Sequence, residues 1–288
     1  MIEKKEIYRP RRSALYMPAA NPRALEKART LDADVLIFDL EDSVAPEAKH
    51  EGRDHLAAAM LQGGYDPREI VIRINHLTTP WGVDDLAMAA RLQPAAVLVP
   101  KVNGAADLVP IREALPAEIA IWAMIETPHS LFNLMEIAGA GLGLSCLIMG
   151  TNDLVKEMRG EHMAGRANLI SALSLAVWAA RAQDLTILDG VYNAIDDGEG
   201  FAAECAQGVA FGFDGKTLIH PSQLLEANRL FAPSAEAVAQ ARDVIDAFNA
   251  PENQGKGVLR VNGQMAELLH RDTALRLVAL DTAIRERQ

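Results

Sequence analysis

Short runs of consecutive apolar residues recur along the chain, and a longer segment with helical character follows each of them. The runs have the length of strands and carry few polar residues on either face. Such runs fit strands that are buried on both sides, as in a parallel sheet covered by helices. Eight are predicted as strands: Ser13–Ala19, Val35–Glu41, Ile70–Asn75, Ala96–Lys101, Ile119–Glu126, Cys146–Asp153, Thr186–Val191 and Phe213–His220.

A helix is predicted after each strand. These helices are Pro22–Leu31, Pro46–Leu61, Val83–Leu92, Ala105–Leu115, Pro128–Ala138, Asn168–Ala182, Glu199–Gly208 and Pro221–Leu230. The polar segment Glu157–Arg166 has no clear period and is expected to be a loop. Eight strand-then-helix units without a hairpin signal predict an α/β fold, a closed (β/α)8 TIM barrel. An open doubly wound sheet is the alternative, but no Gly-x-Gly-x-x-Gly motif follows the first strand.

The sequence beyond the eighth unit does not continue the repeat. Helices are predicted at Ala235–Asn249 and Ala266–Arg285, with a short extended piece at Val258–Asn262 and a turn at Gly263. We therefore divide the chain into a barrel over residues 1–231 and a C-terminal helical lid over residues 232–288. A lid over the C-terminal ends of the strands is a common arrangement in such enzymes.

Composition and charge narrow the classes of partner. Half of the residues are hydrophobic, which supports a large core, and the formal net charge of −11 argues against nucleic acid or an anionic membrane. Cys146 and Cys205 follow no metal or redox spacing and are expected to be buried thiols. Residues 1–6 contain no apolar segment of the kind that export signals have, and no apolar run approaches ~18 residues, so a cytoplasmic location is expected.

Polar residues stand at the C-terminal ends of most predicted strands, where a barrel places its active site. They are Tyr16, Asp39, Glu41, Asp42, Arg73, Asn75, Lys101, Glu126, Asn152, Asp153, Asp189 and His220. One such residue would be unremarkable, but their presence at most strand ends indicates a site. Carboxylates with two cations and an imidazole suit a small, anionic, oxygen-rich substrate.

Glu126 and Asp153 end two successive predicted strands and are therefore expected to lie side by side. Mg²⁺ takes one or two carboxylates in many sites and keeps water and substrate oxygens as its other ligands. The pair is thus the best metal candidate. An ion pair with Arg73 or Lys101, without a metal, is the alternative.

Arg73 lies on a buried strand, so its guanidinium needs acceptors there. Its fork matches a substrate carboxylate, and a structural pair with Asp39 or Glu41 is an alternative that is compatible with this role. Asp39, Glu41 and Asp42 are expected to orient Arg73 or metal-bound water rather than to bind a metal directly. His220 is a candidate acid or base, although a local hydrogen bond is the commoner role at a strand end.

With these residues in view, the sequence resembles the citrate lyase β-subunit-like group of the HpcH/HpaI aldolase superfamily, which includes malyl-CoA lyases and malyl-CoA thioesterases. The resemblance lies in Arg12–Pro18, Phe38–Pro46, Val71–Asn75, Trp81–Gly82, Val99–Lys101, Met124–Glu126, Gly150–Asp153, Asp189–Tyr192 and Gly212–Pro221. It implies a (β/α)8 barrel with a C-terminal lid, in homotrimers or homohexamers. The lid is then expected to complete the site of a neighbouring subunit.

The resemblance also implies a ligand set. It implies Mg²⁺, or alternatively Mn²⁺, on Glu126 and Asp153. The substrate residues that it implies are Arg73, Glu126, Asn152 and Asp153, and the residues along coenzyme A are Tyr16, Lys27, Ile219 and His220. Malyl-CoA lyases commonly have an arginine at the position of Asn21, so the chain departs from the pattern at one CoA contact.

A second departure lies in the lid. The lyases carry Gly-x-Met-Val-Asp there, and their aspartate exchanges a proton with the acyl-CoA enolate across the subunit interface. This chain has Gly263-Gln-Met-Ala-Glu267, so Glu267 keeps the carboxylate but adds a methylene. A displacement of about an ångström can cost on the order of 100-fold in rate. Either Glu267 still serves the enolate, or it activates water against the thioester carbonyl.

We favour a Mg²⁺-dependent enzyme that hydrolyses a short 3-hydroxyacyl-CoA of the (S)-malyl-CoA type to malate and CoA, with Glu267 and Arg73 as catalytic residues. The first alternative is reversible retro-Claisen cleavage of malyl-CoA or citramalyl-CoA to acetyl-CoA and a 2-oxoacid. A CoA-free, metal-dependent 2-oxoacid aldolase and a non-catalytic, effector-binding barrel are lesser alternatives.

Overall fold

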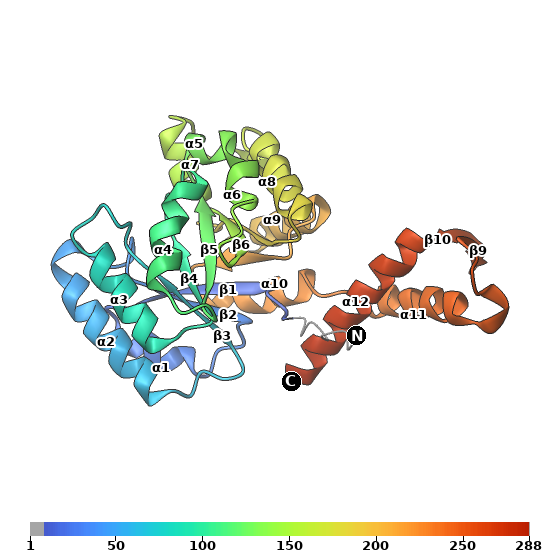
Figure 1. The fold of residues 1–288 in the computed structure, drawn as a ribbon, viewed down its shortest axis with the longest axis horizontal. Helices are drawn as coiled ribbons and strands as arrows, with labels where there is room; N and C mark the ends of the chain where they lie inside the picture. Colours follow the sequence, from blue (N-terminus) through green and yellow to red (C-terminus); the bar gives the residue numbers. More distant parts are fainter. Residues whose placement is uncertain (1–8, 288) are drawn as a thin grey trace. The chain divides into compact units, whose positions relative to one another are not determined.

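The computed structural model describes residues 9–287, which form two compact units. Residues 11–229 make one unit, and residues 9–10 with 230–287 make the other. The N-terminal segment 1–6, in which no export signal was found, lies outside the described residues. Figure 1 shows the chain coloured along its sequence.

Eight parallel strands close into a barrel in the first unit, as the alternating pattern predicts. Each strand pairs with the next in sequence, and β8 pairs with β1 through Ser13–Lys216, Ala14–Thr217 and Leu15–Leu218. The strands are β1 Ser13–Pro18, β2 Val35–Asp39, β3 Glu69–Arg73, β4 Ala96–Val99, β5 Ala120–Ile125, β6 Leu144–Met149, β7 Thr186–Asp189 and β8 Gly215–Leu218. The predicted TIM-barrel fold is therefore confirmed.

Helices surround the strands on the outside of the barrel (Figure 1). They are α1 Pro22–Ala28, α2 Lys49–Gln62, α3 Gly82–Leu92, α4 Val109–Ala114, α5 Pro128–Phe132, α6 Leu134–Ala138, α7 Thr151–Glu157, α8 Ile170–Ala182, α9 Gly198–Phe211 and α10 Leu224–Leu230. Asn21 caps α1 by accepting hydrogen bonds from the N–H groups of Arg23 and Ala24. Within residues 9–287, no helix is both long and apolar enough to cross a membrane.

The inside of the barrel is filled by side chains that alternate along the strands, as in other barrels of this type. Trp122 on β5 is the largest of them and is fully buried. The cluster comprises Ala14, Val35, Ile37, Val71, Ala96, Leu98, Trp122, Met124, Cys146, Ile148 and Leu188. Cys146 and Cys205 are buried free thiols, as predicted.

The strand predicted at Cys146–Asp153 is too long. β6 ends at Met149, and α7 begins at Thr151, so Asp153 lies in the first turn of a helix rather than at the end of a strand. A carboxylate in the first turn is stabilised by the positive end of the helix dipole. Leu154 and Val155, the next two residues of α7, are buried. The segment predicted as a loop contains the end of α7 and the short 3₁₀ helix η3, Ala164–Arg166.

The second unit contains α11 Ala235–Asn249, β9 Val258–Val261, β10 Gln264–Glu267 and α12 Leu268–Arg287, together with the 3₁₀ helix η5. β9 and β10 form an antiparallel hairpin in which Val261 pairs with Gln264. Its turn, Asn262–Gly263, has φ angles of 49° and 82°. Asn-Gly is the preferred pair for such a turn. The prediction of a helix from Ala266 is therefore wrong at its start, because Glu267 lies on β10.

Candidate active site

A cavity of about 290 Å³ lies at the C-terminal ends of the barrel strands. Its walls come from the ends of several strands and from the loops that follow them, as is usual for active sites of this fold. It is lined by Tyr16, Asp39, Asp42, Ser43, Arg73, Met124, Glu126, Met149, Gly150, Thr151, Asn152, Asp153, Val191, Thr217 and Ile219. Eight of the residues predicted from the sequence are among them: Tyr16, Asp39, Asp42, Arg73, Glu126, Asn152, Asp153 and Ile219.

Arg73, at the end of β3, forms a two-pronged ion pair with Asp39 at the end of β2. Arg73 Nε donates to Asp39 Oδ1 and Nη2 donates to Oδ2, each at 2.6 Å, and both side chains are buried. Burial alone would raise the pKa of Asp39, but the Arg73 guanidinium outweighs it and holds that pKa below its usual value. The Tyr16 ring centre lies 4.7 Å from the guanidinium carbon. Arg73 is therefore fixed rigidly at the wall of the cavity.

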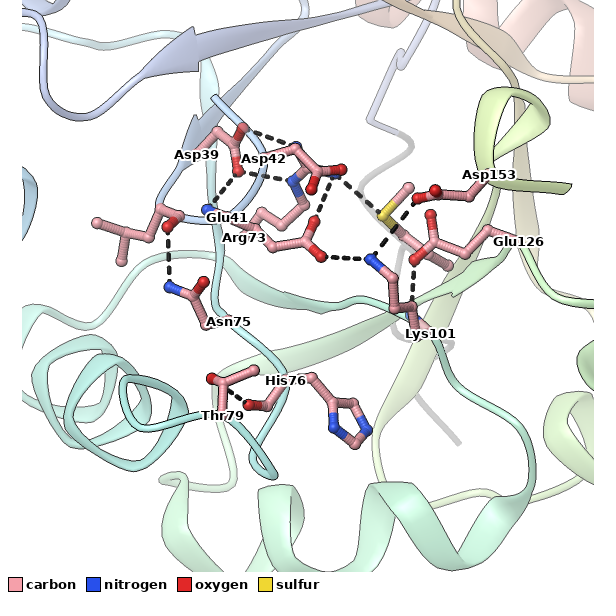
Figure 2. A network of polar contacts seen from close by, with 12 residues as sticks. Asp39, Glu41, Asp42, Arg73, Asn75, His76, Thr79, Lys101, Glu126 and Asp153 are labelled. Atoms are coloured by element: carbon pink, nitrogen blue, oxygen red, sulfur yellow. Dashed lines mark hydrogen bonds and ion pairs between the residues drawn. The ribbon is translucent and has the colours of Figure 1, made fainter. Parts of the chain in front are cut away.

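Glu41 connects this pair to Lys101 (Figure 2). Arg73 Nη1 lies 2.9 Å from Glu41 Oε2, and Lys101 Nζ donates to Glu41 Oε1 at 2.7 Å. Lys101 Nζ also lies 3.6 Å from Asp153 Oδ2. The two cations thus lie on either side of the Glu41 carboxylate. The expectation that Asp39 and Glu41 orient Arg73 agrees with these contacts.

The Lys101 backbone reaches the candidate metal ligand directly. Lys101 follows β4 with a φ of 51°, a conformation that residues with a side chain rarely adopt. In this conformation its N–H donates to Glu126 Oε1 at 2.7 Å. Local strain of this kind often occurs where a binding site needs a fixed geometry. The strained turn after β4 therefore helps to hold the Glu126 carboxylate.

Glu126 follows β5 and is only 1% exposed. Burial, together with the negative charge of Glu41, raises its pKa to about 8. Gly150 lies against it so closely that a Cβ there would stand 2.4 Å from Glu126 Cβ and 2.5 Å from Oε2. Any side chain at position 150 would therefore displace the carboxylate.

The geometry fits a hard divalent cation at Glu126 and Asp153. A buried carboxylate that holds a proton to unusually high pH is one that a cation would stabilise in its ionised form. Both side chains line the cavity, which has room for further oxygen ligands. Among residues 9–287, no group of three or more His, Cys, Asp or Glu side chains is arranged as a metal site. A cation here would therefore need water or substrate oxygens as well, as Mg²⁺ usually does.

Lys27, His220 and Glu267 are not among the residues that line the cavity. Lys27 is exposed in the last turn of α1. His220 caps the 3₁₀ helix η4, Pro221–Gln223, and its Nδ1 accepts a hydrogen bond from the Ser222 N–H, so the local role expected for it is present. Glu267 belongs to the second unit, where its N–H donates to His270 Nδ1. The roles of all three toward CoA or catalysis stay predictions.

Asp189 also differs from its expected place. It is fully buried, and its carboxylate pairs with Arg166 at 2.6 Å and with Lys216 at 3.1 Å, so it joins the end of β7 to the start of β8. Val191, two residues further on, lines the cavity instead.

Sequence reasoning missed several residues of the wall, including Thr151, Thr217 and Val191. It also missed Asn193, whose amide exchanges two hydrogen bonds with that of Asn152. Only proximity to a predicted strand end could have indicated them.

Comparison with known proteins agrees with this architecture. The family model of the HpcH/HpaI aldolase/citrate lyase family matches residues 12–221. A (3S)-malyl-CoA thioesterase from Cereibacter sphaeroides is 46% identical over 275 residues, which are 96% of each chain. The β subunit of citrate lyase from Escherichia coli is 34% identical over 269 residues, which are 90% of this chain and 89% of the relative.

A solved structure is similar to this chain in both fold and sequence. The protein CitE from Mycobacterium tuberculosis, in complex with magnesium, acetoacetate and coenzyme A, aligns with a TM-score of 0.75 at 32% identity. The alignment covers 93% of this chain and 97% of that protein. The family resemblance seen in the sequence is thus confirmed, and this chain belongs to the HpcH/HpaI aldolase/citrate lyase family.

Proposed function

We propose that this protein hydrolyses the thioester of a (3S)-malyl-CoA-type substrate and releases the free hydroxy acid and CoA. Water supplies the oxygen that joins the acyl carbon, and the sulfur of CoA leaves with a proton. The observation that carries the proposal is the 46% identity with a (3S)-malyl-CoA thioesterase, which extends over 96% of both chains. The cavity, which is lined by Arg73 and by the carboxylates proposed to attract a metal, agrees with an oxygen-rich hydroxyacyl substrate.

Glu126 and Asp153 are the residues that we propose to hold Mg²⁺, with Mn²⁺ as a substitute. When bound, the metal would polarise substrate oxygens and offset the negative charge of the surrounding carboxylates. Glu126 is held for this role by the Lys101 N–H and by its contact with Gly150. The magnesium in the CitE complex supports the assignment, because that protein has the same fold.

Arg73 orients the substrate from the opposite wall. Its guanidinium cannot swing away, because Asp39 holds it by two hydrogen bonds and Tyr16 covers one of its faces. A fixed guanidinium lowers the entropic cost of holding an anionic substrate in one orientation. We assign the remaining substrate contacts to Asn152, which the amide pair with Asn193 immobilises.

The second unit supplies the proton-transferring group in this proposal. Glu267 lies on β10, opposite Val258 on β9, so the hairpin fixes its backbone. We propose that the protein forms a homotrimer or homohexamer, in which the lid over residues 232–288 completes the site of a neighbouring subunit. Glu267 then acts as the general base that activates water. Tyr16, Lys27, Ile219 and His220 are the proposed contacts of CoA.

Carbon–carbon cleavage is the second candidate. The citrate lyase β subunit is 34% identical to this chain, and the CitE complex contains acetoacetate and coenzyme A. A lyase would bind the same hydroxyacyl thioester in the same cavity but would release acetyl-CoA and a 2-oxoacid. The two reactions therefore differ in their products rather than in the substrate contacts.

The first experiment separates the candidates by product. The protein is incubated with (S)-malyl-CoA and Mg²⁺, and free thiol and glyoxylate are measured separately. We expect thiol without glyoxylate. Glyoxylate with acetyl-CoA would instead identify the lyase, and neither product would contradict both reactions and favour an effector-binding barrel or a CoA-free aldolase.

Asp153→Asn is expected to weaken Mn²⁺ binding by more than about 100-fold, because it removes one of only two carboxylate ligands. Binding is measured by calorimetry or by the electron paramagnetic resonance signal of Mn²⁺, independently of turnover. Asp42→Asn is the matched control, since Asp42 lines the same cavity but is not a proposed ligand. Equal losses in both variants would mean that general negative charge, and not ligation by Asp153, attracts the metal.

The stability of the chelator-treated protein is expected to fall between pH ~4.5 and about 8, because Glu126 keeps its proton in the folded state over this range while the unfolded chain releases it. The contribution of protonated Glu126 to the free energy of unfolding is complete below pH ~4.5 and is lost as the pH rises through about 8. The slope is at most about 1.4 kcal/mol per pH unit. The free energy of unfolding of Glu126→Gln, measured in urea, should lack this pH-dependent component. If its pH profile equals that of the wild type, the raised pKa of Glu126 is contradicted.

Glu267→Gln is expected to lower kcat for thiol release by about 100-fold or more, since it removes a general base. Affinity for CoA should remain, as measured by calorimetry. Glu267→Asp restores the length of the lyase side chain and should lower hydrolysis relative to glyoxylate formation. Full hydrolytic activity in Glu267→Gln would remove Glu267 from the mechanism.

A further inference from the structure

Lys49, in the first turn of α2, is a cation buried among uncharged acceptors. It is 5% exposed, and its Nζ donates to the carbonyl oxygens of Leu40 and Glu41 and to Asn75 Oδ1, at 2.8, 2.7 and 2.8 Å. Burial lowers the pKa of this ammonium group. The Trp81 ring, whose centre lies 5.2 Å from Nζ, and the three hydrogen bonds offset part of the cost of burial, but an ammonium without a direct carboxylate partner is still a costly way to stabilise a fold. Its position therefore needs a reason other than stability.

The two carbonyl oxygens that Lys49 binds belong to the loop that follows β2. Asn75 fastens the same loop, because its Nδ2 donates to the Leu40 carbonyl at 2.8 Å. Asn75 is fixed in turn by Asp85, which accepts hydrogen bonds from its Nδ2 and its N–H at 2.6 and 3.0 Å. Arg53 Nη1 donates to the other oxygen of Asp85 at 2.9 Å. Hydrogen bonds thus connect four side chains, in the order Arg53, Asp85, Asn75 and Lys49, to the backbone carbonyls of Leu40 and Glu41.

Glu41, whose carbonyl Lys49 holds, carries the carboxylate that lies between Arg73 and Lys101. Lys101 in turn donates its N–H to Glu126. Figure 2 shows Asn75 beside the loop and Glu41 reaching toward Lys101. A small movement of this loop would therefore displace the contacts of the arginine and of the proposed metal ligand together.

We propose that Lys49 is a positioning residue for the reaction, which acts through the backbone of Leu40 and Glu41 to place the Glu41 carboxylate. Lys49 itself does not line the cavity. The inference rests on the proposed function for its kinetic consequences, but the placement of the loop is measurable without any substrate.

The test compares Lys49→Met with Arg112→Met. Arg112 is a matched control, because its guanidinium also donates to three carbonyl oxygens, those of Leu115, Pro116 and Ile119, in the loop before β5. Hydrogen exchange of residues 40–44 is expected to accelerate about tenfold in Lys49→Met and to stay unchanged in Arg112→Met. Equal exchange in wild type and Lys49→Met would overturn the proposal.

Kinetics give the second readout. Lys49→Met should lower kcat by about 100-fold with little change in KM for the CoA ester, because the loop contacts Arg73 directly and Glu126 through Lys101, whereas no proposed CoA contact belongs to it. Arg112→Met should keep its activity even if its melting temperature falls as far as that of Lys49→Met. Full activity in a folded Lys49→Met would contradict the proposal. A wild type without turnover would contradict the proposed function alone, since the exchange test remains valid.

A double-mutant cycle locates the effect. If Lys49 acts through Glu41, the pair Lys49→Met/Glu41→Gln should be no slower than Glu41→Gln alone, whereas independent roles would multiply the two losses. Multiplied losses would overturn the proposal. Should Lys49→Met fail to fold, Asn75→Ala replaces it in all three measurements, because it removes the other support of the Leu40 carbonyl.

Discussion

Negative charge exceeds positive charge at the C-terminal rim of the barrel, and the arrangement of the site follows from this imbalance. Asp39, Glu41, Asp42, Glu126 and Asp153 converge there, and Arg73 or Lys101 pairs with each of them except Glu126. Asp39 accepts two hydrogen bonds from Arg73, and Glu41 contacts both cations. Glu126 accepts a backbone N–H, and burial together with the charge of Glu41 raises its pKa to about 8. A divalent cation at Glu126 and Asp153 would relieve the repulsion that remains.

Backbone features are needed to bring these charges together without losing their geometry. Lys101 adopts a left-handed conformation, so that its N–H and its side chain serve different carboxylates. Gly150 lets the turn after β6 approach Glu126 more closely than any side chain would permit. Lys49 fixes two carbonyls of the loop after β2. Lys101 and Gly150 lie in loops after strands, and Lys49 holds such a loop from α2, so the regular barrel supports a site whose accuracy depends on irregular backbone.

The barrel was predictable because its signal is local and repeated, with a buried strand and a helix in every unit. The placement of residues at strand ends was less predictable. Asp153 was assigned to a strand, because the apolar run before it gives no sign that Thr151 begins a helix. The extended piece Val258–Asn262 and the turn at Gly263 were predicted, but the second strand of the hairpin, which carries Glu267, was missed, because the apolar pattern after the turn also fits a helix. The roles of Lys49 and Lys101 depend on contacts between distant segments, which periodicity does not reveal.

The distribution of these groups explains how one scaffold can serve either hydrolysis or carbon–carbon cleavage. In our proposal, Arg73, Glu126 and Asp153 contact the parts of a hydroxyacyl thioester that both reactions share, so changes among them would impair either reaction. The choice depends on where a proton is removed, from water or at the carbon next to the thioester. In our proposal that choice falls to Glu267, which a separate hairpin holds and which is one methylene longer than the aspartate of the lyases. A change of reaction can then evolve in the lid while the charge network of the barrel stays intact.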